Sequence, residues 1–326
     1  MTCFVGVDGG ATSTVALVSD GHQVVGRGTA GPSNHQVVGM TAAAGAVAEA
    51  VAAALVSAAT GPDTVSRAVL GMAGADFPED VAGLTAALRD RLGFSFTVVN
   101  DAEIALTAGR TGSGPMAVLV LAGTGTNVLA RHQDGLAFHI GGLGYPLGDW
   151  GGGADLVKMA LHHAFRADEG RGPATTLAQV IPAALGVSDF ASLAAALYFG
   201  RIDELTLGLL APLIFREAGR GDRVCQDLLV TMGTRLGESA GAAAARLLAH
   251  DPDGGSVEVV LAGSLWFGAH PLLRDAFHLA LHRTTVRAWS HVTEVEPVVG
   301  ALMAAVGGGA RGDRLRDAFL APHAES

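Results

Sequence analysis

Two glycine turns in the sequence carry the residue types of a phosphate-binding site. The first, residues 8–14, reads DGGATST and follows the apolar run Cys3–Val7. Glycines let the backbone approach phosphate oxygens, and hydroxyl groups donate hydrogen bonds to them. Asp8 is placed to hold Mg²⁺ through water, because Mg²⁺ keeps much of its hydration shell. A plain hairpin with a capping aspartate is the structural alternative. The candidate phosphate contacts are Gly9, Gly10, Thr12 and Ser13.

The second turn, residues 121–127, reads LAGTGTN and offers the same chemistry without a charged side chain. It also follows an apolar run, Met116–Leu121, and it could also be a simple tight turn. The two turns together are more informative than either one alone, because clamping a triphosphate from two domains requires two such hairpins. The candidate contacts in this turn are Gly123, Thr124, Gly125 and Thr126.

Asp101 is the candidate general base. It lies just after the predicted strand Phe96–Val99 and before a predicted helix. A carboxylate there could accept the proton of an attacking hydroxyl, a step that contributes about 10²–10⁴ in rate. The same residue could instead cap the helix, and the two roles are compatible. A third glycine turn, with Gly263 and Ser264, follows the predicted strand Val257–Leu261 and by itself is typical of an ordinary strand-to-helix loop.

The segment 141–153, GGLGYPLGDWGGG, is the most unusual one in the chain. Its seven glycines in thirteen residues cost much backbone entropy when the segment becomes ordered. A plain linker would be polar and rich in serine, whereas this segment carries Leu, Tyr, Trp and Asp149. We therefore interpret it as a ligand-binding loop in which Asp149 contacts hydroxyl groups. Asn34 suits a similar contact, with a role in a turn as the alternative. The adjacent histidines His162 and His163 are expected on a helix surface rather than at a metal.

The elements that position these residues repeat one plan. Apolar runs near Cys3 and near Met116 each begin a series of strand, glycine turn, strand, tight turn and strand. Helices such as Thr41–Ala59 alternate with further strands, so the pattern predicts an α/β fold with two similar halves and a ligand crevice between them. The expected domains are residues 1–112, completed by a C-terminal helix at 298–326, and residues 113–297, which include a helical insertion.

The composition excludes several classes of protein. A chain of 326 residues exceeds one ordinary core, and 49% apolar against 16% charged residues is not the composition of a disordered chain. The net charge of −10 and the lack of a Lys/Arg run argue against nucleic acid or an anionic membrane as partner. Cys3 and Cys225 form no CxxC pair, which fits a reducing cytoplasm. The apolar stretch at 41–59 carries Glu49 and is expected to be a soluble helix.

In combination, these motifs resemble the N-acetylglucosamine kinase branch of the BadF/BadG/BcrA/BcrD ATPase family, within the actin, Hsp70 and sugar-kinase superfamily. The resemblance covers nearly the whole chain and implies two actin-like, ribonuclease H-like ATPase domains with an interdomain active-site cleft. The motifs that carry it are residues 5–14 and 121–131 as phosphate loops, 261–264 as adenosine motif, 99–102 around the catalytic aspartate, 144–153 as sugar loop and 296–302 as closing helix.

The resemblance also implies a reaction, the ATP-dependent phosphorylation of an amino sugar at its 6-hydroxyl, with N-acetylglucosamine as the leading acceptor. Asp101 would accept the hydroxyl proton, Asp8 would position Mg²⁺, and Gly263 and Ser264 would join the two phosphate turns in binding ATP. A homodimer is the assembly that the resemblance favours. The residues that it assigns to the acceptor are Asn34, Asp101, Asn127, Gly144, Tyr145 and Asp149.

The sequence departs from the family's pattern in both ligand loops. In the first turn Ala11 replaces a glycine and Ser13 replaces a basic residue. In the sugar loop Trp150 and Gly152 stand in place of Glu and Ser, and Tyr145 lies near the usual Trp. These changes leave the acceptor open, so a glucosamine kinase or a broader amino-sugar kinase is the alternative.

Two other classes of the superfamily fit the residues less well. A dehydratase activase needs cysteine ligands for an iron–sulfur cluster, and Cys3 and Cys225 do not offer that pattern. A non-catalytic sugar sensor is disfavoured because Asp8 and Asp101 are both present.

Overall fold

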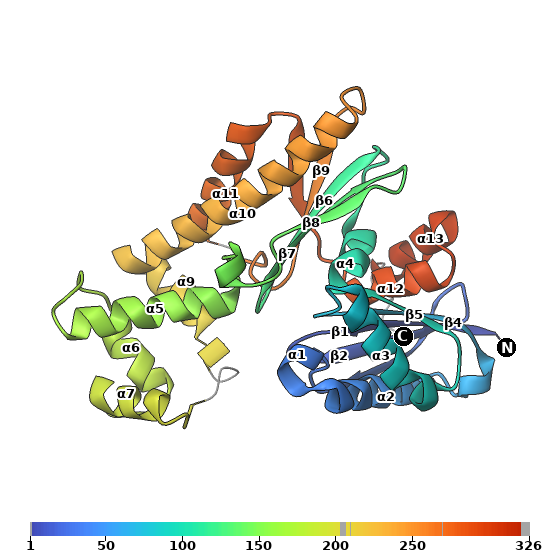
Figure 1. Ribbon diagram of the computed structural model, residues 1–326, viewed down its shortest axis with the longest axis horizontal. Coiled ribbons are helices and arrows are strands. Elements are labelled where there is room, and N and C mark those ends of the chain that lie inside the picture. Colours follow the sequence, from blue (N-terminus) through green and yellow to red (C-terminus); the bar gives the residue numbers. More distant parts are fainter. Residues whose placement is uncertain (1, 203–206, 209, 269, 321–326) are drawn as a thin grey trace, which may run out of the picture. The chain divides into compact units, whose positions relative to one another are not determined.

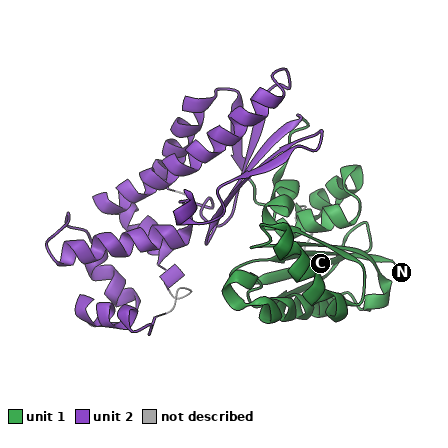
Figure 2. Ribbon diagram, in the orientation of Figure 1, with its two compact units in different colours: residues 1–113, 293–326 green, residues 114–292 purple. Residues whose placement is uncertain are grey.

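The computed structural model describes residues 2–202, 207–208, 210–268 and 270–320. The chain forms two compact units, which Figure 2 colours separately. Unit 1 comprises Met1–Ser113 and Thr293–Ser326, and unit 2 comprises Gly114–Val292. The chain thus returns to unit 1 directly after the last strand of unit 2, a few residues before the boundary expected at 297/298.

Unit 1 is built on a mixed sheet with the strand order β3-β2-β1-β4-β5 (Figure 1). The first three strands pair antiparallel through tight turns, whereas β1–β4 and β4–β5 pair parallel across helical connections. The strands are β1 Cys3–Gly9, β2 Thr14–Ser19, β3 Val24–Ala30, β4 Val65–Met72 and β5 Phe96–Asn100. Helices between the parallel pairs are what the residue pattern predicts, because parallel strands need a crossover connection.

Helices cover both faces of the unit 1 sheet. Side chains that alternate along the strands explain this layering, since Val5 and Val7 pack in one core and Leu17 packs in another with α12. The core with Val5 and Val7 also contains residues of α2 and α3, and Val69 joins Ile104 of α4 in a smaller cluster. The helices are α1 His35–Val38, α2 Met40–Ser57, α3 Pro78–Leu92, α4 Asp101–Gly109, α12 Pro297–Ala305 and α13 Gly309–Leu320, with a 3₁₀ turn at Pro62–Thr64.

The closing helix α12 crosses α4 at a glycine. A Cβ atom on Gly300 would lie 1.9 Å from the carbonyl oxygen of Ile104, so only glycine permits this approach of the two backbones. The crossing brings a segment from the end of the sequence onto the sheet that the first residues form. It also brings Glu296, just before α12, into unit 1.

The apolar helix α2 is long and apolar enough to span a membrane by length and composition. In the structure its face with Ala44, Val47 and Ala54 is fully buried in the unit 1 core. The helix is therefore a core helix of unit 1, as expected from the sequence.

Unit 2 repeats the sheet of unit 1 with the strand order β10-β9-β6-β7-β8. As in unit 1, two antiparallel pairs, β6–β7 and β7–β8, are followed by parallel pairs, β6–β9 and β9–β10. The strands are β6 Met116–Ala122, β7 Thr126–His132, β8 Ala137–Ile140, β9 Val257–Ala262 and β10 Ala288–Val292. The repeated plan inferred from the sequence is therefore confirmed at the level of strand order and direction.

The helices of unit 2 share one large core with its sheet. The long helix α10 contributes a buried stripe that includes Leu229, Leu236 and Ala243, packed with Val118 and Val259 of the sheet. The helices are α5 Gly153–Asp168, α6 Leu177–Ala184, α7 Phe190–Tyr198, α9 Ala211–Gly219, α10 Arg223–His250 and α11 Pro271–Thr284, with a 3₁₀ turn at Tyr145–Leu147. The helical insertion lies between β8 and β9, where the sequence pattern placed it.

Candidate active site

The first glycine turn joins β1 to β2 and is fixed by backbone hydrogen bonds. The amide of Gly10 donates to the carbonyl of Ser13 at 2.9 Å, and the amide of Ala73 donates to the carbonyl of Gly9 at 2.8 Å. The alternation of side chains from Ala11 to Val18 predicts a strand there, but β2 begins only at Thr14, because this turn takes up residues 10–13. Thr12 and Ser13 are exposed, so their hydroxyl groups are available to a phosphate.

Asn34 is held directly beside this turn. The amides of Ser33 and Asn34 donate to the carbonyl oxygen of Gly10 at 3.0 and 3.2 Å, and Thr14 donates a side-chain hydrogen bond to the buried Ser33 at 2.8 Å. The side chain of Asn34 accepts from the amide of Gln36 at 3.0 Å and caps helix α1. Asn34 therefore has the turn role that the sequence offered as the alternative, while its contact with the acceptor stays a prediction.

Strand register brings Asp101 to the same edge of the sheet as Asp8. Gly9 of β1 is paired with Met72 of β4, and Met72 is paired with Asn100 of β5. The carboxyl ends of three parallel strands therefore meet at one edge, where ligands of open α/β sheets bind. Adjacent strands lie about 4.8 Å apart, so Asp8 near the end of β1 and Asp101 just after β5 belong to strand ends separated by roughly 10 Å.

The cap of helix α4 is Asn100, not Asp101. The side chain of Asn100 accepts a hydrogen bond from the amide of Ala102 at 3.0 Å and donates one to Asp76 at 2.9 Å. Asp101 is the first helical residue, and the interpretation of Asp101 as the cap is wrong because the preceding asparagine has the extended conformation that a cap needs. The Asp101 carboxylate is thereby left for other chemistry.

Burial and, to a lesser extent, the nearby carboxylate of Asp76 raise the pKa of Asp101 to about 6. The backbone amides of Ala102 and of Asp101 itself act in the opposite direction. Asp101 is partly buried at the start of a helix, so its ionised form is costly but accessible near neutral pH. Such a carboxylate suits a general base at physiological pH.

Burial, followed by the carboxylates of Asp101 and Glu296, raises the pKa of Asp8 to about 7. The causes that raise the pKa of Asp8 are thus burial and two carboxylates, and all three disfavour its ionised form. A divalent cation would supply compensating positive charge, and oxygen ligands are the ones that Mg²⁺ prefers. The donor set thus fits the magnesium role expected for Asp8. The contribution of Glu296 was missed, since nothing in the sequence places residue 296 beside residue 8.

The second glycine turn joins β6 to β7 in unit 2 and is braced by the start of helix α5. The amides of Gly153 and Ala154 donate to the carbonyls of Gly123 and Thr124 at 2.8 and 3.0 Å. The turn closes on itself through the amide of Gly123, which donates to the carbonyl of Gly125 at 2.9 Å. Its shape is therefore fixed by contacts within unit 2.

The third glycine turn lies against the end of the same strand. Leu121 of β6 is paired with Ala262 of β9, and the amide of Leu265 donates to the carbonyl of Ala122 at 3.1 Å. Gly263 and Ser264 consequently stand next to the second glycine turn. The residues proposed for phosphate and for adenosine are thus neighbours in unit 2, although each looked like an ordinary turn by itself.

Gly152 is in direct contact with the second glycine turn. A Cβ atom at this position would lie 2.6 Å from the carbonyl oxygen of Thr124 and 2.7 Å from the Cα atom of Gly125. Both are backbone atoms, so a side chain at residue 152 cannot be accommodated without moving the turn. The departure from the family's usual serine at this position therefore matches the local packing.

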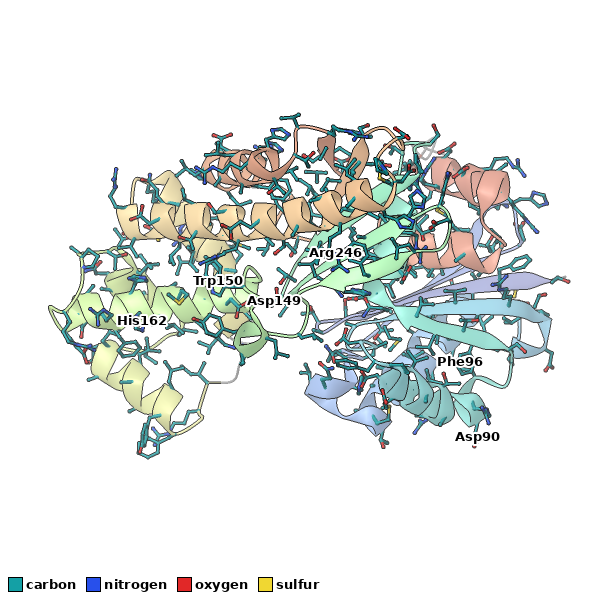
Figure 3. All side chains as sticks on the ribbon, turned by 45° about the horizontal axis from the view of Figure 1, so that its top comes forward. Asp90, Phe96, Asp149, Trp150, His162 and Arg246 are labelled. Carbon is teal, nitrogen blue, oxygen red and sulfur yellow. The ribbon has the colours of Figure 1, made fainter. Side chains whose placement is uncertain are left out.

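Asp149, whose side chain Figure 3 labels beside Trp150, ties the glycine-dense segment to β7. One carboxylate oxygen of Asp149 accepts from the hydroxyl of Thr126 at 2.9 Å, and the other accepts from the amide of Gly142 at 3.1 Å. Asn127 is buried, and its side-chain oxygen lies 2.8 Å from Nδ1 of His139. Asp149 and Asn127 thus organise the loop in this structure, while Gly144 and Tyr145 lie on its exposed part.

A cavity of about 700 Å³ in unit 2 is bordered by this loop. Tyr145, Asp149 and Trp150 line it on the loop side, opposite residues of α5 and α10 such as Leu228. The half-buried His163 also lines the cavity. His162 is exposed, as expected for a residue on a helix surface. A cavity with aromatic and carboxylate side chains is suited to a polar ring compound.

Comparison with known proteins identifies the family. A model of the BadF/BadG/BcrA/BcrD ATPase family matches residues 5–305. The chain belongs to this family. In this BadF/BadG/BcrA/BcrD family member, unit 1 gathers Asp8, the first glycine turn, Asn34 and Asp101, and unit 2 gathers the other two glycine turns with the loop around Asp149.

Two relatives found by sequence comparison are named as sugar kinases. An N-acetyl-D-glucosamine kinase from Dictyostelium discoideum is 31% identical over 245 residues, which are 72% of this chain and 76% of the relative. An N-acetylmuramic acid/N-acetylglucosamine kinase from Clostridium acetobutylicum is 28% identical over 235 residues, 70% of this chain and 75% of the relative.

Solved structures support the same family fold. A protein from Chromobacterium violaceum, proposed to be an N-acetylglucosamine kinase, matches with a TM-score of 0.72 and 25% identity, over 93% of this chain and 98% of that one. A ROK family glucokinase from Streptomyces griseus, solved with glucose and AMPPNP, matches with a TM-score of 0.59 and 20% identity, over 93% of this chain and 98% of that one. The latter shows a shared fold, which is the two-domain, actin-like fold expected from the sequence.

Proposed function

We propose that this protein is an ATP-dependent amino-sugar kinase that transfers the γ-phosphoryl group to the 6-hydroxyl of N-acetylglucosamine. The observation that carries the proposal is Asp101, a partly buried carboxylate with a pKa of about 6, on the same sheet edge as the first glycine turn. The proposal of a sugar acceptor rests on the family and on the named activity of the 31% identical relative.

In the proposed mechanism Asp101 accepts the proton of the sugar hydroxyl as that oxygen attacks the γ-phosphorus. A new bond forms between the sugar oxygen and phosphorus, the bond from phosphorus to the β,γ-bridging oxygen breaks, and ADP leaves with that oxygen. The glycine turns at residues 9–13 and 123–126 bind the phosphates through amide and hydroxyl groups, and Gly263 and Ser264 contact the adenosine. Catalysis of this kind depends mainly on positioning and on charge stabilisation.

Asp8 would hold the Mg²⁺ that accompanies ATP. The ion supplies neutralisation of the phosphate charge when it is bound. Asp8 meets that role because its carboxylate is partly buried beside another carboxylate and has a pKa raised to about 7. A bound cation favours the ionised carboxylate, and the pKa of Asp8 should then fall.

For the acceptor we propose contacts to Asn34, Asp101, Asn127, Gly144, Tyr145 and Asp149. The net charge of −10 leaves nucleic acid and anionic membranes as poor partners, and we expect a cytoplasmic homodimer. Glucosamine remains the alternative acceptor, because Asp76 beside Asp101 offers a carboxylate to a protonated 2-amine.

The acceptor is tested by following ADP release with ATP-Mg²⁺ and a panel of N-acetylglucosamine, glucosamine, N-acetylmannosamine, N-acetylmuramic acid and glucose. We expect N-acetylglucosamine to exceed glucosamine and glucose in kcat/KM by about 10²-fold, since a site built to hydrogen-bond the acetamido group rejects sugars that lack it. N-acetylmannosamine and N-acetylmuramic acid keep that group, so they report instead on the configuration at carbon 2 and on the substituent at the 3-hydroxyl. If glucosamine has the highest kcat/KM, the proposed acceptor is wrong but the assignment as a kinase stands. ADP release that no sugar raises above background would contradict the proposal.

The pH profile should report Asp101 directly. Because Asp101 must be ionised to accept a proton, kcat/KM should fall about tenfold per pH unit below pH 6 at saturating Mg²⁺. Asp76→Asn removes a negative charge that raises this pKa, so the acid limb should move to lower pH. The exposed Asp63 gives the control Asp63→Asn. An acid limb that responds equally to both substitutions would count against Asp101 as the base.

A further inference from the structure

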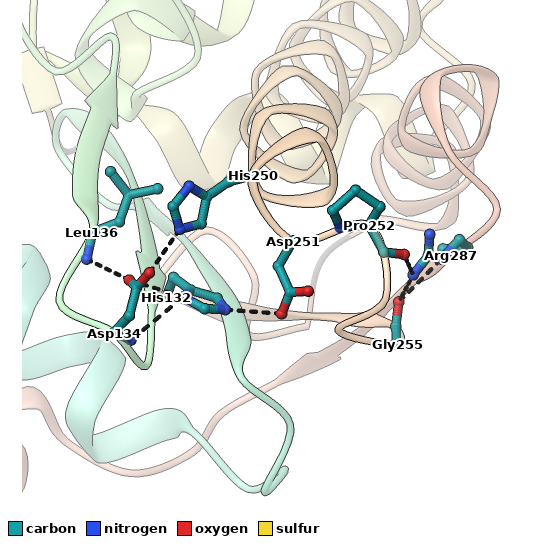
Figure 4. Close-up of polar contacts among 8 residues, drawn as sticks. All are labelled: His132, Asp134, Leu136, His250, Asp251, Pro252, Gly255 and Arg287. Carbon is teal, nitrogen blue, oxygen red and sulfur yellow. Dashed lines mark hydrogen bonds and ion pairs between the residues drawn. The ribbon is translucent and has the colours of Figure 1, made fainter.

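A cluster of histidines and aspartates lies at the opposite end of β7 from the second glycine turn (Figure 4). His132 is the last residue of β7, and Asp134 lies in the turn to β8. His250 ends helix α10, and Asp251 follows it. A strand rises about 3.3 Å per residue, so the cluster is roughly 20 Å along β7 from Thr126 and is separate from the proposed kinase site.

Three residues of the cluster each bring one ligand atom close to the others. Asp134 stands between the two rings, with one carboxylate oxygen 2.8 Å from Nδ1 of His132 and the other 2.7 Å from Nε2 of His250. The ligand atoms of these three residues all lie within 4.8 Å of one another. Bonds of about 2.0–2.2 Å to a shared ion place ligand atoms roughly 3.3 Å apart in a tetrahedral site, so small side-chain rotations would accommodate one.

Both ring nitrogens of His132 face a carboxylate oxygen. Nδ1 faces Asp134, and Nε2 lies 3.1 Å from Asp251. A neutral imidazole has one N–H group and one lone pair, so it can donate to only one of these carboxylates. A metal ion on Nδ1 would satisfy both sides, because Nε2–H would then donate to Asp251. A carboxylate behind the second nitrogen is the arrangement in which metal-binding histidines are usually found.

The surrounding backbone holds these side chains in place before any ion binds. The amide of Leu136 donates to the Asp134 carboxylate at 3.0 Å. On the other side, Arg287 donates to the carbonyls of Pro252 and Gly255 at 2.9 and 3.0 Å and fixes the loop after Asp251. A Cβ atom on Gly254 would lie 2.2 Å from the Asp251 carboxylate, so glycine at this position leaves room for that group in its present orientation.

We propose that His132, Asp134 and His250 bind a divalent transition-metal ion of the Zn²⁺ class, with Asp251 orienting His132. Two imidazoles and one carboxylate favour such an ion over Mg²⁺, which prefers oxygen ligands. Three protein ligands leave a fourth position for water. The ion would join the β7–β8 turn to the end of α10, whose residues are 116 positions apart at Asp134 and His250, and would act as a structural clamp in unit 2.

The proposal is tested by titrating the full, tag-free and chelator-treated protein with ZnCl₂ in a calorimeter at pH 7.5. We expect one site per chain, at least tenfold weaker binding in His250→Ala and in Asp251→Asn, and no change in His22→Ala. His250 is partly exposed, so its variant should fold, which circular dichroism of the metal-free proteins checks. His22 is an exposed histidine of unit 1 and is the matched control.

A second measurement follows Tm with and without Zn²⁺. Zn²⁺ should raise the Tm of the parent protein and of His22→Ala but not that of His250→Ala, because an ion that binds only the folded state stabilises it. Kinase activity with saturating ATP-Mg²⁺ should be equal in all these proteins. The proposal is overturned if the parent protein binds no Zn²⁺, or if His250→Ala binds it as tightly as His22→Ala; the cluster would then be an ion-pair network only.

Discussion

Asp101→Asn should lower kcat by about 10²–10⁴ while the KM for ATP stays within twofold. The substitution keeps the shape of the side chain and removes its ability to accept a proton. Since burial raises the pKa of Asp101, the ionised carboxylate is less stable in the folded chain than in the unfolded one. The protonated side chain of Asp101 therefore contributes favourably to stability at low pH, and this contribution is lost as the pH rises through about 6 and the group ionises.

The variant should consequently be as stable as the parent protein at pH 7.5, or slightly more stable. Single-turnover assays separate the chemical step from ATP binding, and a thermal melt shows that the fold is retained. Asp90→Asn, on an exposed position of α3, is the matched control and should keep parent kcat. A kcat for Asp101→Asn close to that of the parent would assign proton transfer to another group.

The short strands and their glycine turns could be predicted because each is a local pattern. An apolar run that ends in Gly9 or Gly123 reads as a strand and a tight turn without knowledge of the rest of the fold. The duplication of the two units followed from the same runs. Where the prediction failed, as at the start of β2, the backbone of residues 10–13 closes a turn that alternation of side chains does not reveal.

The site was predictable only as far as its residues follow strand ends. Asp101 could be found because it comes directly after an apolar strand, but the choice of Asn100 as cap depends on backbone conformation. Glu296 acts on Asp8 only through the position of α12, and no local pattern records that contact. The cluster of His132 and His250 was missed for the same reason, since its two halves are brought together by the packing of a hairpin against a helix end.

The loop around Asp149 shows a different limit. Its glycine content indicated function, yet the sequence did not show that Asp149 would bond to Thr126 and to the amide of Gly142. The loop and the second glycine turn therefore form one structural unit. A change in the loop should be transmitted to the turn that we propose to bind phosphate.

Gly152→Ser tests this connection and should lower kcat/KM for ATP by about 10²-fold, because displacing a positioning group by about 1 Å has an effect of that size. Serine is the residue that the sugar-loop resemblance leads one to expect at this position, so we predict that introducing it impairs the protein. The reason is steric: the new Cβ atom would meet the backbone of Thr124 and Gly125 at under 3 Å, and the turn would have to move. The assay is the rate of ADP release at varied ATP concentration and saturating sugar.

Gly219→Ser is the control, since Gly219 is exposed and a Cβ atom there meets nothing within 4 Å. An increase in the KM for ATP in Gly152→Ser, with the KM for the sugar little changed, would assign the damage to the turn rather than to the acceptor loop. An equal rise in both would instead place the acceptor against the same backbone. Parent kinetics in Gly152→Ser would mean that the turn tolerates displacement, and its proposed role in holding phosphate would have to be given up.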